Sequence, residues 1–289
     1  MGTLYYAGLS GLILPVPKAD LGGGLFLEVT YGHLFAPFMM AFQPAHPGAA
    51  HPAPWRAVSA GFATDIHCQL VIPAAHTREG LSDALETAWL IATLLRLRIG
   101  PHVRAAMISS AQISTESAKR DEGELWAVEV LPAPLIGNMR SSLTLGEDEI
   151  RWLRTNWQRA SKLAGAHRDF KVLLEAYSAC SWARSAGLAL VELWGALQRL
   201  FTQGHQEASL RLSVLLSSYL EPPGIERRKL AERIAKLYGA RSQGAHGAQT
   251  DDLQPLADSA NIAARTIIRL IEHEGVPTRD DLFDMLYGV

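Results

Sequence analysis

The chain has 289 residues, of which 48% are hydrophobic and 19% are charged, and its formal net charge is −2. This length allows one large domain or two ordinary ones, and the composition excludes a disordered tail. The near-neutral charge excludes a globally basic nucleic-acid coat, although it permits a local basic patch. The two cysteines, Cys68 and Cys180, lie far apart, so the sequence contains no disulfide framework and no zinc-ligand set.

The N-terminus lacks the basic start of a secretory signal. The longest apolar stretch, residues 84–100, is interrupted by Glu86, Arg96 and Arg98, and it is too short and too charged to span a bilayer. Together with the few cysteines, these features predict a soluble, cytoplasmic protein that does not enter a membrane.

Residues 1–137 are expected to form a β-rich α+β domain of unknown role. Short β-like runs at 25–32, 61–73 and 124–132 are separated by Pro and Gly, and one helix is predicted at Leu81–Ile99. The Pro/Ala/His-rich segment 43–55 is predicted to be a loop. Alternation in the second run predicts one face made of four apolar residues, Ile66, Cys68, Leu70 and Ile72.

Residues 147–289 are expected to form an all-α antiparallel helical bundle. Short connections such as 221–224 (EPPG) must interrupt the helices and favour antiparallel neighbours. Amphipathic periodicity predicts helices at residues 146–165, 169–184, 187–201, 206–220, 225–246, 252–273 and 280–286.

Histidine is the side chain best suited to acid/base chemistry near neutral pH. His46 and His51 lie in the predicted loop without a third metal ligand, and His67 and Cys68 are expected to face opposite sides of a strand. An arginine followed closely by a histidine occurs three times, so this spacing alone indicates nothing. The three pairs are Arg96–His102, Arg199–His205 and Arg241–His246.

The third pair follows a basic helical segment that also has a core-facing apolar stripe. A solvated charged face and attraction to phosphate both explain such a run, and the sequence leaves both open. Residues five apart on a helix point about 140° away from each other. Arg241 and His246 therefore need either a helix that loosens near Gly244 and Gly247 or a second copy of the chain. The basic residues are Arg227, Arg228, Lys229, Arg233, Lys236 and Arg241.

The stretch LYGARSQGAHG, residues 237–247, resembles the signature of HEPN domains, most closely the Apea-like branch with its pattern Leu-Tyr-x-x-Arg-Ser-x-x-x-His-Gly. The resemblance covers residues from about 169 to the C-terminus, and Gly244 departs from the bulkier residues common between the arginine and the histidine. The matching residues are Leu237, Tyr238, Arg241, Ser242, His246 and Gly247.

This resemblance implies a metal-independent endoribonuclease of the toxin or phage-defence type that needs no cofactor. It implies a homodimer in which paired motifs meet, with RNA as substrate and an antitoxin or trigger protein as a further partner. His246 would be the general acid/base, Arg241 would hold the scissile phosphate, and Ser242 would orient one of them. The residues expected to bind RNA are Tyr238, Lys236, Arg233 and Gly247.

Two alternatives remain at this point. The first is a non-catalytic HEPN-type module that keeps the fold and binds a nucleotide or RNA, or only dimerises. In the second, Arg241 and His246 form a hydrogen-bonded helix end in an interaction protein.

Overall fold

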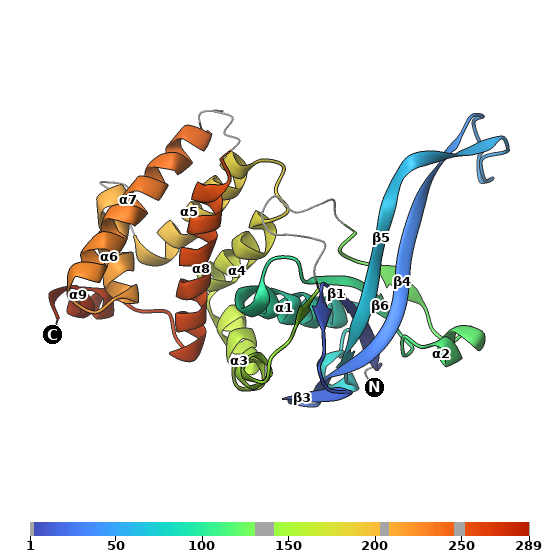
Figure 1. Ribbon diagram of the computed structural model, residues 1–289, viewed down its shortest axis with the longest axis horizontal. Helices are drawn as coiled ribbons and strands as arrows, with labels where there is room; N and C mark the ends of the chain where they lie inside the picture. The colour runs from blue at the N-terminus through green and yellow to red at the C-terminus, as the bar shows by residue number, and fades with distance from the viewer. Residues whose placement is uncertain (1–2, 131–141, 203–207, 246–251, 289) are drawn as a thin grey trace.

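The computed structural model describes residues 3–130, 142–202, 208–245 and 252–288 (Figure 1). An antiparallel sheet occupies one side of the molecule and a group of helices the other, with α1 (Leu81–Ile99) and α3 (Glu147–Ala166) between them. The predicted α+β class, with a β-rich first half and a helical second half, is confirmed.

The large sheet has the strand order β3-β4-β5-β1-β6-β7, and every neighbouring pair in it is antiparallel. A separate parallel pair joins the start of the chain to the segment that precedes α3. Its strands are β2 (Leu12–Ile13) and β8 (Leu143–Thr144). The strands of the large sheet are β1 (Tyr5–Ser10), β3 (Lys18–Gly22), β4 (Leu25–Ala41), β5 (Trp55–Ile72), β6 (Arg104–Ser109) and β7 (Leu125–Ala127).

Helix α1 packs against β1, β5 and β6, while the short α2 (Thr115–Lys119) lies on the opposite side of the sheet (Figure 1). A one-turn helix, η1 (Ala74–His76), precedes α1. The remaining helices are α4 (Arg168–Cys180), α5 (Ala186–Phe201), α6 (Ala208–Leu220), α7 (Ile225–Ala245), α8 (Gln254–Glu272) and α9 (Arg279–Tyr287).

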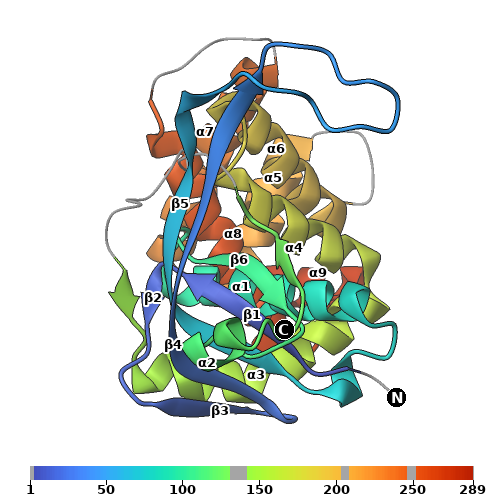
Figure 2. The same cartoon turned by 90° about the vertical axis from the view of Figure 1, so that its right-hand side faces the viewer.

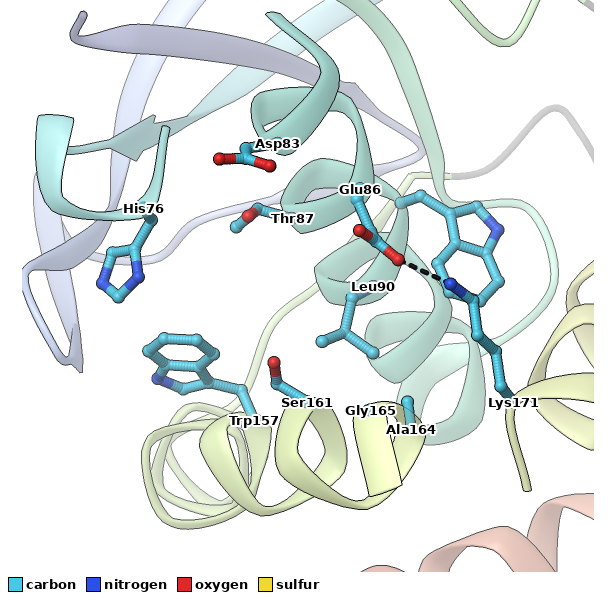
Figure 3. Close-up of a pocket in the computed structure, with 11 residues that line it drawn as sticks. His76, Asp83, Glu86, Thr87, Leu90, Trp157, Ser161, Ala164, Gly165 and Lys171 are labelled. Atoms are coloured by element: carbon cyan, nitrogen blue, oxygen red, sulfur yellow. Dashed lines mark hydrogen bonds and ion pairs between the residues drawn. The ribbon is translucent and has the colours of Figure 1, made fainter. Parts of the chain in front are cut away.

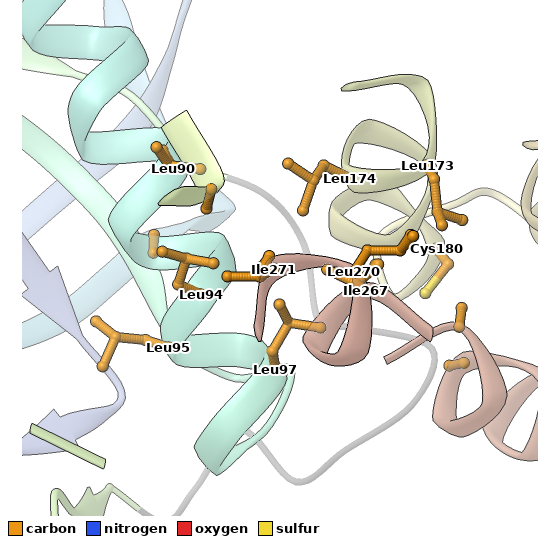
Figure 4. Packing of buried hydrophobic residues seen from close by; sticks show 14 of the residues in the cluster. Leu90, Leu94, Leu95, Leu97, Leu173, Leu174, Cys180, Ile267, Leu270 and Ile271 are labelled. Carbon is orange, nitrogen blue, oxygen red and sulfur yellow. The ribbon is translucent and has the colours of Figure 1, made fainter. Parts of the chain in front are cut away.

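One hydrophobic core runs through both halves of the molecule. Leucines of α1 meet apolar residues of α4 and α8, as Figure 4 shows. The chain becomes helical from Glu147, where α3 begins. The buried hydrophobic core nevertheless includes side chains from both sides of this point. The residues at this junction include Leu90, Leu94, Leu97, Leu173, Leu174, Ile267, Leu270 and Ile271.

The predicted apolar face of β5 is wrong at one residue. Cys68, Leu70 and Ile72 belong to the main core, but Ile66 packs in a separate small cluster with Ala106 and Met107. The register of β5 shifts at this point against both β1 and β4, and such a bulge turns the following residues to the other face.

The strands are also longer and more numerous than predicted. β4 continues past Gly32 to Ala41, and β1, β3 and β6 were not predicted. The helices agree more closely, since α1 has the predicted bounds and α6 ends at Leu220 before the EPPG segment. Within the described part of the chain, no helix is both long and apolar enough to cross a membrane.

Candidate functional site

Helix α7 carries most of the sequence motif and ends one residue before His246. It continues through Gly244 to Ala245, so the predicted loosening at Gly244 does not occur. His246 and Gly247, together with the side chain of Ser242, lie outside what the structure describes. The described members of the predicted site are therefore Tyr238, Arg241, Lys236 and Arg233.

Tyr238 is held in the interior between α7 and α5. Its side chain is only 8% exposed, and its ring meets the ring of Trp194 edge-on, with the two centroids 6.0 Å apart. The phenolic hydroxyl donates a hydrogen bond to Gln198 Oε1 over 2.9 Å. Trp194 is itself fixed, because its indole nitrogen donates to Ser259 Oγ of α8 at 3.0 Å. Three helices thus position this one aromatic ring.

Arg241 lies one turn after Tyr238 and rests on it. The guanidinium carbon is 5.1 Å from the centre of the Tyr238 ring, and Nη1 donates to the Tyr238 hydroxyl over 3.2 Å. The Nε atom is buried without a hydrogen-bond partner among the described residues. No carboxylate in that part of the chain lies within ion-pair distance of Arg241. Among the described residues, the side chain that holds the Arg241 guanidinium is thus the phenol of Tyr238 and not a carboxylate.

Most other basic residues of α7 have internal partners. Arg227 donates to the carbonyl oxygen of Glu221 and to carbonyl oxygens at the end of α9. Arg228 and Lys229 form ion pairs with Glu232 and Glu226 at 3.0 and 2.7 Å. The basic run is therefore largely neutralised in the first half of the helix.

Arg233 has a structural role that the sequence did not indicate. Its Nη2 atom forms an ion pair with Asp258 Oδ1 of α8 at 2.7 Å, and Gln254 donates to the same carboxylate oxygen. The hydrogen bond from Arg233 holds the pKa of Asp258 below its usual value. Lys236, by contrast, is exposed and has no ion pair within the described ranges. The described basic residues of α7 without a carboxylate partner are thus Arg227, which carbonyl oxygens bind, and Lys236 and Arg241 in the half of the helix that carries the motif.

The other two Arg–His pairs of the sequence have ordinary structural roles. Arg96 is buried and donates to Val103 O, to Ser178 Oγ and to the Glu129 carboxylate. Arg199 forms an ion pair with Asp169 of α4 at 2.8 Å. His205 lies outside the described residues.

Sequence reasoning missed a histidine–aspartate pair on the sheet. His33 of β4 and Asp65 of β5 are cross-strand neighbours, and His33 Nδ1 is 2.7 Å from Asp65 Oδ1. This hydrogen bond lowers the pKa of Asp65. His33 borders a cavity of about 480 Å³ whose wall includes Leu34, Met107 and Ile113. Because the two residues are 32 positions apart, only the strand register could have revealed them.

A second cavity, of about 330 Å³, lies between α1 and α3 (Figure 3). An ion pair between Lys171 and Glu86 spans 2.7 Å at one side of it. His76 Nε2 on the opposite side donates a hydrogen bond to the carbonyl oxygen of Gly23 over 2.7 Å, and the imidazole packs edge-on against Trp157. Its imidazole therefore fixes the turn before β4.

No group of three or more His, Cys, Asp or Glu side chains that could hold a metal ion occurs in the described segments. Both cysteine thiols are buried, and burial raises the pKa of Cys68 to about 12 and that of Cys180 to about 11. Neither thiol is suited to nucleophilic attack at neutral pH.

No family model, curated protein or solved structure matches the chain. The HEPN assignment therefore rests on the motif in residues 237–247 and stays a prediction.

Proposed function

We propose that the protein is a metal-independent endoribonuclease that cleaves RNA at a composite Arg/His site formed by two copies of the chain. The observation that carries this proposal is the state of Arg241. Its guanidinium is fixed on Tyr238 at the end of α7, and no described carboxylate neutralises it. An arginine prepared in this way is suited to hold a phosphate.

The roles of the remaining residues come from the resemblance to Apea-like HEPN domains. His246, which directly follows the last residue of α7, would remove the proton of the ribose 2′-hydroxyl or protonate the leaving oxygen. In-line attack by that hydroxyl on the phosphorus would expel the 5′-oxygen of the next nucleotide and leave a 2′,3′-cyclic phosphate. Arg241 would stabilise the charge on the phosphate oxygens, Ser242 would orient the groups, and no metal would be required.

The continuity of α7 supports the dimeric form of the site. The helix reaches Ala245 without a break, and residues five apart on a helix that continued would point about 140° away from each other, so pairing Arg241 with residue 246 favours a second copy. A second copy that faces the first across a two-fold axis can supply the missing partner. We propose Lys236 and Gly247 as further residues that contact RNA. Arg233 would contribute indirectly, by the ion pair with Asp258 that joins α7 to α8.

The direct test incubates total RNA with purified protein in the presence of EDTA. We expect RNA fragments that end in a cyclic phosphate, and we expect Arg241→Ala and His246→Ala each to lower the rate at least about 100-fold. Arg228→Ala is the matched control, because this exposed arginine of the same helix pairs with Glu232. Equal RNA decay with all four proteins, or none with any, would exclude cleavage at this site.

The biological setting belongs to the same proposal. The protein would act in the cytoplasm as a toxin or phage-defence effector, restrained by an antitoxin or released by a trigger. Expression of the wild type should then arrest growth, and Arg241→Ala should relieve the arrest. If the wild type binds RNA without cutting it, the chain is instead a non-catalytic binding module of the same fold.

A further inference from the structure

The distal half of the β4–β5 hairpin extends beyond the rest of the sheet, and we call residues 33–65 the arm (Figures 1 and 2). β3 pairs with β4 only as far as Glu28, and β1 pairs with β5 only from Ile66 onward. Within the arm, β4 and β5 therefore have only each other as described strand partners, although Leu34 and Phe62 near its base contact residues of β6. A two-stranded ribbon of this kind is marginally stable in water unless something packs on it.

The arm exposes an unusual amount of apolar surface. Phe35 is 65% exposed and Phe38 is 57% exposed, and five further residues of the arm are 44–53% exposed. Aromatic and methionine side chains are the types most enriched at the centres of protein interfaces. These five residues are Met39, Met40, Phe42, Trp55 and Val58.

The charge of the arm limits what can cover it. Arg56 is the only Lys, Arg, Asp or Glu residue in positions 34–64. Asp65 at the base of the arm pairs with His33, and a surface with the single further charge of Arg56 offers little to the phosphates of RNA or to an acidic or basic protein patch. Two copies of such a weakly charged surface, however, meet with little repulsion.

Area and backbone also favour a second copy. A fully buried aromatic side chain covers roughly 150–250 Å². The half-exposed residues of the arm therefore present roughly 600 Å² of apolar surface on each protomer. Each partner in a standard interface contributes about 800 Å², which is close to this value. No strand in the described ranges pairs with the outer edge of β5 in the arm, and this edge contains no proline from Trp55 to Asp65. In β4, Pro37 lacks the N–H that edge pairing needs.

We propose that the arm joins two copies of this chain, arm against arm, around a two-fold axis. Both the distal end of the arm and the C-terminal end of α7 lie on the upper side of the molecule in Figures 1 and 2, but Figure 1 shows the arm at the right of the molecule and α7 at the left. The arm contact is therefore proposed as an interface separate from the α7 ends. The arm inference does not depend on ribonuclease activity, since it stands on the exposure, charge and pairing of residues 33–65.

The test is the mass of the full chain in solution by analytical ultracentrifugation over a range of micromolar concentrations. We expect a dimer for the wild type, and we expect Phe35→Asp and Phe38→Asp each to raise its dissociation constant about thirtyfold or more. Ile225→Asp is the matched control, because Ile225 is 61% exposed at the other end of α7. Arg241→Ala should abolish RNA cleavage and leave the dimer intact, which separates the two proposals.

A second readout does not require the loss of large apolar side chains. With both natural thiols buried, Val58→Cys adds one accessible thiol near the proposed axis, and mild oxidation should link two chains. Ile225→Cys should give no such link. Far-UV circular dichroism identifies any variant that fails to fold. If an Asp variant fails to fold, the Val58→Cys cross-linking decides whether two arms meet.

Three outcomes would overturn the proposal. The first is a monomeric wild type over the whole concentration range. The second is a dimer that survives both arm substitutions and that the Val58→Cys variant does not link on oxidation. The third is a monomer that sediments with phosphatidylcholine vesicles only when Phe35 and Phe38 are intact, which would assign the arm to a lipid surface.

Discussion

Arg241 lies against Tyr238, with its guanidinium carbon 5.1 Å from the ring centre and a hydrogen bond from Nη1 to the phenolic oxygen. The same hydroxyl donates to Gln198, so the arginine is connected to α5 through a buried phenol. This arrangement restricts the side chain before any ligand binds, which lowers the entropy lost when it binds phosphate. It also explains why Tyr238 belongs to both the core-facing stripe and the motif.

Removal of this hydroxyl should destabilise the protein while leaving the ring in place. Tyr238→Phe leaves the Gln198 oxygen and Arg241 Nη1 without this partner, so we expect the free energy of unfolding to fall by about 1 kcal/mol. Urea denaturation measures the change. Tyr287→Phe is the control, because Tyr287 is largely exposed and should lose far less. Equal losses for the two variants would mean that the Tyr238 hydroxyl contributes nothing.

No close contact in the described part of the chain requires a glycine at position 239. Gly239 lies inside α7, and a methyl group added there meets nothing within 4 Å. Gly239→Ala should therefore raise the free energy of unfolding by about 1 kcal/mol, as expected for glycine in a helix interior. Gly195→Ala in α5 is the matched control with the same free space. If only Gly239→Ala fails to stabilise the protein, its face of α7 is covered by something outside the chain.

The buried ion pair of Arg96 and Glu129 should contribute strongly to stability. Glu129 also accepts a hydrogen bond from the backbone nitrogen of Ala105 over 2.8 Å, and the Arg96 side chain is almost fully buried. Because Glu129→Gln leaves a buried guanidinium without its counter-charge, we expect a loss of about 3 kcal/mol in unfolding free energy. Thermal unfolding of this variant is compared with Glu116→Gln, whose exposed pair with Lys119 should matter little.

The pair between Arg233 and Asp258 predicts a pH dependence. The hydrogen bond from Arg233, followed by that from Gln254, lowers the pKa of Asp258 from its ordinary value of 3.8. A carboxylate with a lowered folded-state pKa stabilises the protein above its unfolded-state pKa, and this contribution is lost as the pH falls through the lowered value.

Calorimetry should therefore show that Asp258→Asn unfolds at a lower temperature than the wild type at neutral pH. The difference should shrink as the pH falls below 3.8 and through the lowered folded-state pKa, since Asp258 is then protonated in both the unfolded and the folded state. High salt should also reduce it, since the pair is partly exposed. A difference that is the same at neutral and acidic pH would show that the ion pair does not stabilise α7 against α8.

The helices could be predicted well because their signals are local. Leu81–Ile99 lies between Gly80 and Gly100, and the break before α7 is present in the residues EPPG. The strands could not be predicted as well, because a glycine or a proline in the local sequence, here Gly32 and Pro37, usually indicates the end of a strand. β4 continues past both residues because β5 pairs with it along almost its whole length. That pairing joins residues far apart in the chain, and the local periodicity of the sequence does not indicate it.

The residues of the candidate site could be predicted from the sequence, but their contacts could not. Sequence alone selected Arg241 and the basic helix that leads to it. It could not show that Arg233 is tied to Asp258, or that Lys236 and Arg241 remain without carboxylate partners in the described part of α7. These facts depend on which residues of α5 and α8 face α7, and no motif specifies that.

The most direct measurement of the central claim mixes two inactive variants, Arg241→Ala and His246→Ala, and assays RNA cleavage in EDTA after subunit exchange. If each site takes its arginine from one copy and its histidine from the other, the mixture should recover about one quarter of the wild-type rate, because half of the dimers are mixed and each contains one intact site. A mixture that stays as inactive as either variant alone, while exchange is confirmed, would contradict the composite site.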